Sequence, residues 1–319
     1  MPDRKVLKGI KPFNRFLFIS CYYHQLIAAY SYFGLEPEVQ LSNYYPVYLF
    51  NAKESGIKVS MRSVNGKPVM EKMTGVRETV KHESKDIVDE AIDSVQEGSP
   101  VIIAVDAFYL PYRETAYQKA HLPHYLLIYG YDDEKSEFIV SDHMHLNSYQ
   151  YTERFLGYGD LRKAYEGYIQ NFYNTNKRVI VKFRKTGEAQ TDRGNFSRFF
   201  ESVQKRFDSN ITVINKIARH VAENIDGIWL NPEMLNTYAV FFGKLNQIKM
   251  SQGNVFRYYD AVNSERAELC RAAADAALFI SSVICKLRFT KTMAGPLKQK
   301  VVQKLEDIID AEKGIVGSP

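Results

Sequence analysis

Residues 101–142 read VIIAVDAFYLPYRETAYQKAHLPHYLLIYGYDDEKSEFIVSD. This stretch holds three strand candidates, which are Val101 to Asp106, Tyr125 to Tyr131 and Phe138 to Ser141. The continuous apolar runs IIAV and YLLIYG are typical of strands inside a sheet. The polar turn from Asp132 to Glu137 joins the last two strands, so we expect them to pair. The stretch therefore predicts the centre of a β-sheet.

Elements on both sides of this stretch complete a mixed domain. Cys21 to Phe33 repeats apolar residues at helical spacing and Gly34 is a natural helix end, so Cys21 should lie in the first turn of a helix. Asp86 to Gln96 is typical of an amphipathic helix. Val179 to Phe183 is expected to close the sheet.

The region between Tyr44 and Met73 has shorter apolar patterns. Tyr45 to Phe50 and Ile57 to Met61 have strand-like composition, and Asn65-Gly66 is a turn signal. We expect strands and a hairpin here, within the same domain.

From Asn195 onward the pattern is helical. The polar stretch Lys185 to Gly194 is typical of a domain boundary. Asn231-Pro232 predicts a helix start, Asn254 to Leu287 could form one long helix, and Pro296 opens a last one. We therefore predict an α+β fold. Residues 1–187 would form a domain with an N-terminal helix packed on a small antiparallel sheet, and residues 195–319 an all-helical domain.

The composition narrows the classes of function. The chain has 319 residues and a formal net charge of +5, from 42 Lys+Arg against 37 Asp+Glu, which is too mild to indicate a nucleic-acid binder. Leu17 to Leu35 carries no Asp, Glu, Lys or Arg, but its polar residues fit a buried helix better than a membrane span. The cysteines Cys21, Cys270 and Cys285 form neither a CxxC pair nor a disulfide framework, which favours the cytoplasm.

Three residues could form a nucleophilic site. A helix start stabilises negative charge, which favours the thiolate of Cys21. His124 immediately precedes a strand and could take the thiol proton, while Asp142 closes the next strand and could fix the imidazole tautomer. In an antiparallel pair the start of one strand lies beside the end of the next, so we expect His124 and Asp142 to be neighbours.

Each of these residues also has a structural interpretation. An unpaired cysteine is commonly a core residue, a histidine at a strand edge can be satisfied by one hydrogen bond, and Asp142 could only cap a turn. Packing is the default interpretation for Cys270 and Cys285. His24 shares the helix of Cys21 and cannot readily aim at its thiol.

A metal site is a further alternative, because imidazoles and a carboxylate suit zinc or iron. Its candidate ligands are His121, His124, Asp142, His143 and His145. We predict no metal, because short histidine groupings recur by chance and no ligand spacing here is diagnostic.

The proposed residues resemble a known group of enzymes. Cys21 at a helix start, followed by HYLLIYGYDDEKSEFIVSD at 124–142, resembles the Cys-His-Asp arrangement of papain-fold enzymes, particularly the group that contains bacteriocin leader peptidases. SCYYHQLIAAYSYFG at 20–34 and GSPVIIAVDAFYLPYRETAYQKAHLPHYLLIYGYDD at 98–133 are more specifically similar to the N-terminal domain of the butirosin biosynthesis protein H family. This resemblance covers roughly the first half of the chain.

The resemblance implies acyl transfer from an acyl carrier protein to an amine in natural-product assembly. It implies that Cys21 is the acyl-accepting nucleophile, His124 the general base and then acid, and Asp142 the orienting group. Papain-fold enzymes place a glutamine about six residues before the cysteine to help hold the oxyanion. This chain has Arg15 there, with Asn14 beside it, and we take Asn14 as the candidate oxyanion donor.

Aromatic and basic residues could serve binding. Among 22 tyrosines and 19 phenylalanines, Tyr22, Tyr109 and Tyr112 are candidates to line a pocket for an acyl or aromatic group, although core packing explains most of these rings. A basic run could steer an acidic carrier protein, although a solvated face is the commoner explanation. The run comprises Lys286, Arg288, Lys291, Lys298, Lys300 and Lys304.

Together these observations predict a cytoplasmic, thiol-dependent acyltransferase that needs no cofactor. It would meet phosphopantetheine only as the arm of an acyl carrier protein or peptidyl carrier domain, and its acceptor would be a small-molecule amine in peptide or aminoglycoside-type biosynthesis. The same residues with water as acceptor would make a peptidase, amidase or thioesterase. A non-catalytic protein that binds a carrier domain or peptide is the alternative from another class. We expect no nucleic-acid or membrane partner and leave homodimer formation open.

Overall fold

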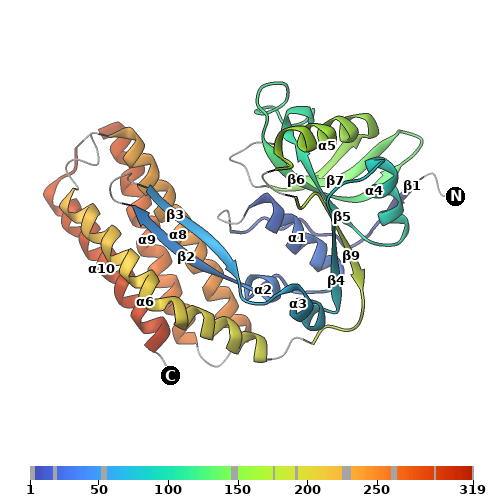
Figure 1. Ribbon diagram of the computed structural model, residues 1–319. Helices are drawn as coiled ribbons and strands as arrows, with labels where there is room; N and C mark the ends of the chain where they lie inside the picture. The colour runs from blue at the N-terminus through green and yellow to red at the C-terminus, as the bar shows by residue number, and fades with distance from the viewer. Residues whose placement is uncertain are drawn as a thin grey trace. The chain divides into compact units, whose positions relative to one another are not determined.

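The chain folds into two compact units. The computed structural model describes residues 4–16, 20–51, 56–144, 150–174, 177–190, 193–224, 231–259, 264–290 and 292–317 (Figure 1). The first unit comprises Met1–Pro37 and Gly66–Gln190, and the second comprises Glu38–Asn65 and Thr191–Pro319. An antiparallel sheet precedes a series of long helices along the chain, so the predicted α+β class is confirmed.

The first unit is built on one antiparallel sheet. Among the described residues the strand order is β4-β9-β5-β6-β7-β8, with β1 paired to β6. The strands are β1 (Arg4–Val6), β4 (Val76–Lys81), β5 (Val101–Asp106), β6 (Pro123–Asp132), β7 (Glu137–Asp142), β8 (Thr152–Gly157) and β9 (Ile180–Lys185). The helices are α1 (Cys21–Tyr32), α3 (Lys67–Thr74), α4 (Ile87–Gln96) and α5 (Tyr158–Phe172), with a short 3₁₀ turn η1 (Ala107–Tyr109).

The second unit combines long helices with a β-hairpin. Its helices are α2 (Pro37–Leu41, at the border between the units), α6 (Arg193–Glu223), α8 (Pro232–Tyr259), α9 (Ser264–Thr290) and α10 (Gly295–Gly317). The hairpin pairs β2 (Tyr44–Asn51) with β3 (Gly56–Ser63). Asn210 of α6 fastens the hairpin to the helices, because its Oδ1 accepts the N–H of Tyr48 at 3.3 Å and its Nδ2 donates to the carbonyl of Pro46 at 3.0 Å.

The hairpin region differs from the sequence-based division. Residues 38–65 pack with the helices, where β2 contacts α6 and β3 contacts α8, whereas the sequence analysis placed them inside the domain 1–187. Asn65-Gly66 is not the hairpin turn, because Gly66 is the N-cap of α3. The connection between the two strands, residues 52–55, lies outside the described residues.

The prediction of one helix from Asn254 to Leu287 is wrong. Helix α8 ends at Tyr259 and α9 begins at Ser264. The two helices pack against each other, and the side chain of Asn246 donates to the carbonyl of Ala274 at 2.9 Å. The helical pattern runs on through the break, so spacing alone gave no sign of it.

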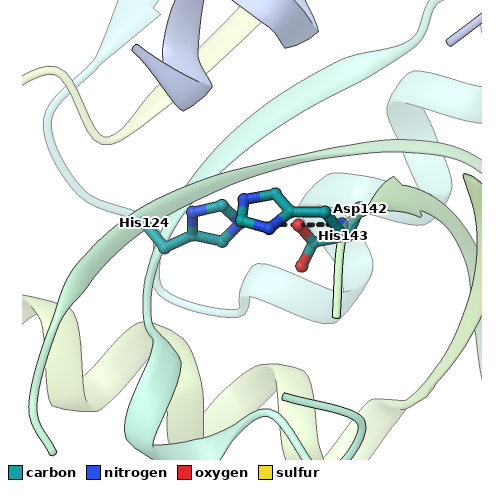
Figure 2. Close-up of side chains that lie close together, drawn as sticks. All are labelled: His124, Asp142 and His143. Atoms are coloured by element: carbon teal, nitrogen blue, oxygen red, sulfur yellow. Dashed lines mark hydrogen bonds and ion pairs between the residues drawn. The ribbon is translucent and has the colours of Figure 1, made fainter. Parts of the chain in front are cut away.

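A β-bulge sets which side chains of β6 and β7 share a face. Pairing runs from Asp132↔Glu137 to Gly130↔Ile139, then shifts by one residue to Ile128↔Val140. Tyr129 is the extra residue, and an extra residue exchanges the faces of all side chains beyond it. His124 therefore lies on the same face as Asp142, and Figure 2 shows the two side chains in contact.

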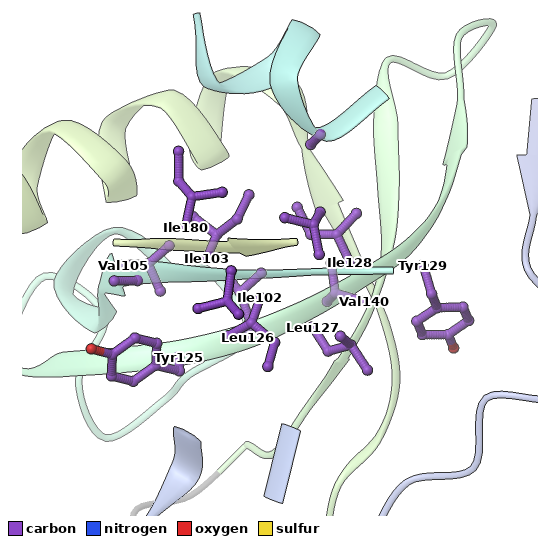
Figure 3. Packing of buried hydrophobic residues seen from close by; sticks show 14 of the residues in the cluster. Ile102, Ile103, Val105, Tyr125, Leu126, Leu127, Ile128, Tyr129, Val140 and Ile180 are labelled. Atoms are coloured by element: carbon purple, nitrogen blue, oxygen red, sulfur yellow. The ribbon is translucent and has the colours of Figure 1, made fainter. Parts of the chain in front are cut away.

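Strand β6, which carries His124, and the neighbouring strand β5 are packed in the core of the first unit. Ile102, Ile103, Leu126 and Leu127 are fully buried, and Figure 3 shows them packed among residues of the neighbouring strands. Each such side chain stabilises the fold by about 1.5–3 kcal/mol. The ends of β5, β6 and β7 are therefore held in fixed positions.

No helix among the described residues has the length and apolar character needed to cross a membrane.

Candidate active site

Cys21 occupies the first position of α1. Ser20 precedes it in extended conformation, and the carbonyl of Ser20 accepts the N–H groups of Tyr23 and His24 at 3.0 and 3.2 Å. The positive end of the helix dipole at this terminus favours a nearby anion. Cys21 is half-buried.

His124 is the direct partner of Cys21. The imidazole of His124 and the backbone N–H of Tyr125 lie close enough to the Cys21 thiol to influence its pKa. Burial alone would raise the pKa of the Cys21 thiol, but the positive charge and hydrogen bond of His124, with the Tyr125 N–H, outweigh it and lower that pKa. Burial and Arg113 act to lower the pKa of His124, but Asp142 and Cys21 outweigh them and raise it. Both shifts favour a thiolate–imidazolium pair.

Asp142 is the most heavily coordinated side chain of the site. Its Oδ1 lies 2.7 Å from Nε2 of His124 and accepts the backbone N–H of His143 at 2.7 Å, while its Oδ2 accepts the hydroxyl of Tyr112 at 2.8 Å. Burial would raise the pKa of Asp142, but His124 and then Arg113 outweigh it and hold the pKa at about 2. Asp142 is therefore an anion that engages Nε2 of His124, which leaves Nδ1 as the nitrogen for the Cys21 thiol.

Arg113 is a buried cation that the sequence analysis did not find. Its side chain is 2% exposed, and Nη1 lies 3.3 Å from Oδ1 of Asp142. The residue sits in the polar segment between β5 and β6, which gives no sign that one of its arginines is buried.

Gln25 is a second residue that sequence reasoning missed. It lies one helical turn after Cys21 and is fully buried. Its Nε2 donates to the carbonyl of Ser141 at 2.7 Å and approaches that of Tyr125 at 3.5 Å. Gln25 thus ties α1 to the two strands that carry His124 and Asp142. A glutamine four residues after the cysteine was the available signal.

His24 has a structural environment. Its Nδ1 lies 2.7 Å from the carbonyl of Phe13, and its ring stacks on Tyr151 at 4.9 Å. Burial lowers the pKa of His24 to about 4, so the ring is neutral at pH 7. His24 is therefore not the base for Cys21.

The metal alternative reduces to three described residues. One ligand atom each from His124, Asp142 and His143 lies within 4.8 Å of the others (Figure 2). His121 instead pairs with Asp106, its Nδ1 2.6 Å from Oδ2, and His145 lies outside the described residues. The Arg113 guanidinium lies 3.3 Å from Oδ1 of Asp142, and its positive charge disfavours a metal cation there.

The predicted oxyanion donor is engaged elsewhere. The side chain of Asn14 pairs with the backbone of Tyr151, accepting its N–H at 2.7 Å and donating to its carbonyl at 3.0 Å. This pairing holds the N-terminal segment to the chain before β8 and directs the amide away from the role predicted for it. The backbone N–H of Cys21, at the start of α1, remains the candidate donor.

The three tyrosines predicted to bind substrate are packed or bonded within the unit. Tyr22 is buried against Tyr125, with ring centroids 5.2 Å apart, and the Arg178 guanidinium lies 4.7 Å from its ring. Tyr109 packs on Gly167 of α5, and the hydroxyl of Tyr112 is bonded to Asp142. Tyr112 thus helps to hold the carboxylate of Asp142 in place.

The other two cysteines have different surroundings. Cys270 is fully buried in α9, and burial raises the pKa of its thiol to about 12. Cys285 is exposed on the same helix. The surroundings of Cys21 lower the pKa of its thiol, whereas those of Cys270 raise it.

A comparison with known families bears on the first half of the chain. Residues 44–143 match the model of a family described as butirosin biosynthesis protein H, N-terminal. The matched segment contains His124 and Asp142 and begins after Cys21. No curated protein matches the chain. The resemblance drawn from the sequence is therefore confirmed over residues 44–143.

Proposed function

We propose that this protein is a thiol-dependent acyltransferase that moves an acyl group from a carrier-protein thioester to an amine. One observation carries the proposal: Nε2 of His124 lies 2.7 Å from Oδ1 of the anionic Asp142, and His124 in turn lowers the thiol pKa of Cys21, a half-buried cysteine at a helix start. This arrangement supplies a nucleophile, a proton carrier and an orienting group.

The chemistry proceeds in two half-reactions. His124 takes the proton of the Cys21 thiol, the thiolate attacks the thioester carbonyl, and the backbone N–H of Cys21 stabilises the oxyanion. When the tetrahedral intermediate collapses, the carbon–sulfur bond of the donor breaks and the leaving thiolate takes the proton from His124. The amine then attacks the acyl-enzyme, His124 removes the amine proton and returns it to the sulfur of Cys21, and the amide is released.

Carrier protein and amine as substrates rest on the family resemblance and on charge. The family name refers to butirosin biosynthesis, so we assign the chain to natural-product assembly. The second unit has 21 Lys+Arg against 16 Asp+Glu, and the first has 21 of each, so the second unit carries the whole net charge of +5. A basic unit suits the approach of an acidic carrier protein.

The test is an acyl adduct on Cys21. The full-length protein is incubated with an acyl thioester of pantetheine, and each cysteine peptide is then searched for the acyl mass. We expect the adduct on Cys21, no adduct in Cys21→Ala, and an unchanged result in the control Cys285→Ser. Absence of any adduct that depends on Cys21 would overturn the proposal.

The fate of the adduct separates the two enzymatic alternatives. An isolated acyl-enzyme is mixed with a panel of primary amines in water, and amide and free acid are measured. Amide as the main product supports the transferase, whereas free acid with every amine indicates a hydrolase. If Cys21→Ala retains the full activity of the protein in its host, the chain acts by binding alone.

A further inference from the structure

The site contains two buried charges of opposite sign, on Asp142 and Arg113. Asp142 and Arg113 are both almost fully buried, at 0% and 1% exposure, and lie 3.3 Å apart. Isolating either ion from water is costly, so each requires the other. A neutral amide could orient His124 equally well with no counter-ion.

Counting charges in both protonation states shows what Arg113 supplies. With thiol and neutral imidazole, the buried charges are Asp142 and Arg113, which cancel. With thiolate and imidazolium, two negative and two positive groups again cancel. Without Arg113 the site would hold one uncompensated negative charge in either state. This surplus negative charge would stabilise the imidazolium form of His124 and so oppose transfer of its proton.

We propose that Arg113 is a positioning residue that neutralises Asp142, so that the pair orients His124 as one uncharged unit and leaves the imidazole free to exchange its proton. This inference rests on the proposed function of Cys21 and His124. It assigns to Arg113 a role in the proton-transfer steps without contact with the substrate.

The fold places Arg113 by means of a closed loop. Oδ1 of Asp106 accepts the N–H groups of Phe108 and Leu122 at 3.0 and 3.2 Å, so one carboxylate gathers both ends of the connection between β5 and β6. Within this loop Tyr112 and Arg113 are adjacent and contact different oxygens of Asp142. Contacts to both oxygens fix the orientation of the carboxylate plane.

Several charged or titratable groups surround His124, and they come from four parts of the unit. They are Cys21 on α1, Tyr112 and Arg113 in the loop, Asp142 on β7 and His143 after it, and Arg154 on β8 near Tyr112. Arg154 and His143 are left intact in the variants below, so a change in behaviour reports on Arg113.

The experiment is a double-variant cycle with two readouts on the full-length protein. The variants are Arg113→Met, Asp142→Asn, both together, and Arg113→Lys. The first readout is the pH profile of Cys21 alkylation by iodoacetamide, followed by peptide mass spectrometry with Cys285 as internal reference. The second is the melting temperature at pH 7.

We expect Arg113→Met to move the alkaline step of the profile, where His124 loses its proton, upward by about one pH unit. Arg113→Lys should return that step towards its original position. Each single neutralisation should lower the melting temperature by roughly 5–10 °C, and the double variant should recover at least half of that loss.

Two results would overturn the inference. One is an alkaline step that stays in place in Arg113→Met; the other is a double variant whose loss of melting temperature equals the sum of the single losses. If Arg113→Met does not fold, Arg113→Lys and the double variant carry the test. The cycle needs no acyl donor, so it can succeed where acyl transfer fails. If Cys21 is inert in the unmodified protein, the proposed function fails, and the melting temperatures alone decide whether Arg113 neutralises Asp142.

Discussion

Nε2 of His124 lies 2.7 Å from Oδ1 of Asp142 because β6 carries one residue more than β7 across their pairing. If the register set by Asp132↔Glu137 continued without a shift, Tyr125 would share a face with Asp142, and His124 would point to the other side. The bulge at Tyr129 therefore creates the contact on which the site depends.

Gly130 at this bulge should tolerate no side chain. A Cβ there would lie 2.9 Å from Cδ1 of Ile139 and 3.1 Å from the carbonyl of Lys5. We expect Gly130→Ala to lower the free energy of unfolding by about 1–3 kcal/mol, measured by urea denaturation, and to slow Cys21 alkylation as His124 shifts.

Gly159 provides the matched control. It lies in the first turn of α5, where an added Cβ meets nothing within 4 Å. Gly159→Ala should leave alkylation unchanged and raise stability by up to about 1 kcal/mol. If both glycine variants behave alike, the bulge is not the constraint described here.

The charge of His124 should govern the reactivity of Cys21. In His124→Gln the thiol keeps a hydrogen-bonding neighbour but loses the cation, and the effect of burial is to raise its pKa. We expect alkylation at pH 6 to fall at least about tenfold, and the midpoint of the profile to move towards the ordinary thiol pKa of about 8.5. Cys285 in the same digest should keep its rate, and an unchanged Cys21 midpoint would contradict an activated thiol.

Gln25 should couple the position of α1 to the sheet. Gln25→Met keeps the length of the side chain but removes its bond to the Ser141 carbonyl, at a cost of roughly 1–3 kcal/mol for a buried unpaired carbonyl. The reaction of Cys21 with iodoacetamide should slow as well, because the thiol and imidazole are no longer held in register. Gln96→Met is the control, since Gln96 bonds to the hydroxyl of Tyr131 far along the chain from Cys21. Equal effects of the two variants on Cys21 would argue against this anchoring role.

His24 should make the protein sensitive to acid. Its pKa in the folded protein is about 4, below the value of about 6.5 in an unfolded chain. The unfolded chain therefore binds a proton as the pH falls through 6.5 while the folded protein does not, so stability is lost between pH 6.5 and 4, by up to roughly 3 kcal/mol. His24→Gln should flatten this decline in urea unfolding at successive pH values. The exposed His82→Gln should retain it, and a decline of equal slope in both variants would exclude His24 as its source.

A buried ion pair in the second unit should show strong coupling. Nζ of Lys249 lies 2.6 Å from Oε1 of Glu312 and 2.7 Å from Oε1 of Gln252, and the two charged residues are 2% and 8% exposed. Lys249→Met leaves Glu312 without its counter-ion and should cost about 3–5 kcal/mol in urea unfolding, whereas adding Glu312→Leu should restore much of it. Strictly additive losses would show that the two charges do not depend on each other.

The sequence predicted the helices and strands whose apolar residues recur at a regular spacing. It missed the contacts between residues that lie far apart in the chain. Helix α1 and strands β5, β6 and β7 follow from apolar spacing, so Cys21, His124 and Asp142 were found. Arg113 lies within the polar stretch PYRETAYQKAHLP, typical of a surface loop, and its partner is 29 residues away. The bulge at Tyr129 has no sequence signature here. The sequence therefore predicted that His124 and Asp142 are neighbours, but not the bulge that brings them together.

Asn14 shows the same limit. A side-chain amide near the cysteine was a reasonable oxyanion donor by type, but its partner is the backbone of Tyr151, 137 residues later. Spacing along the chain could not predict this pairing, because the Tyr151 backbone offers both a donor and an acceptor to any side chain that reaches it.

The attachment of the hairpin to α6 also has a consequence for folding during synthesis. Tyr48 leaves the ribosome 162 residues before its partner Asn210. At about 5–20 residues per second, the β2–β3 hairpin waits on the order of ten seconds or more for the helices that cover it. During that time an isolated two-stranded ribbon has marginal stability and exposes its edges. The nascent chain therefore exposes this ribbon from the release of β3 until the release of α6.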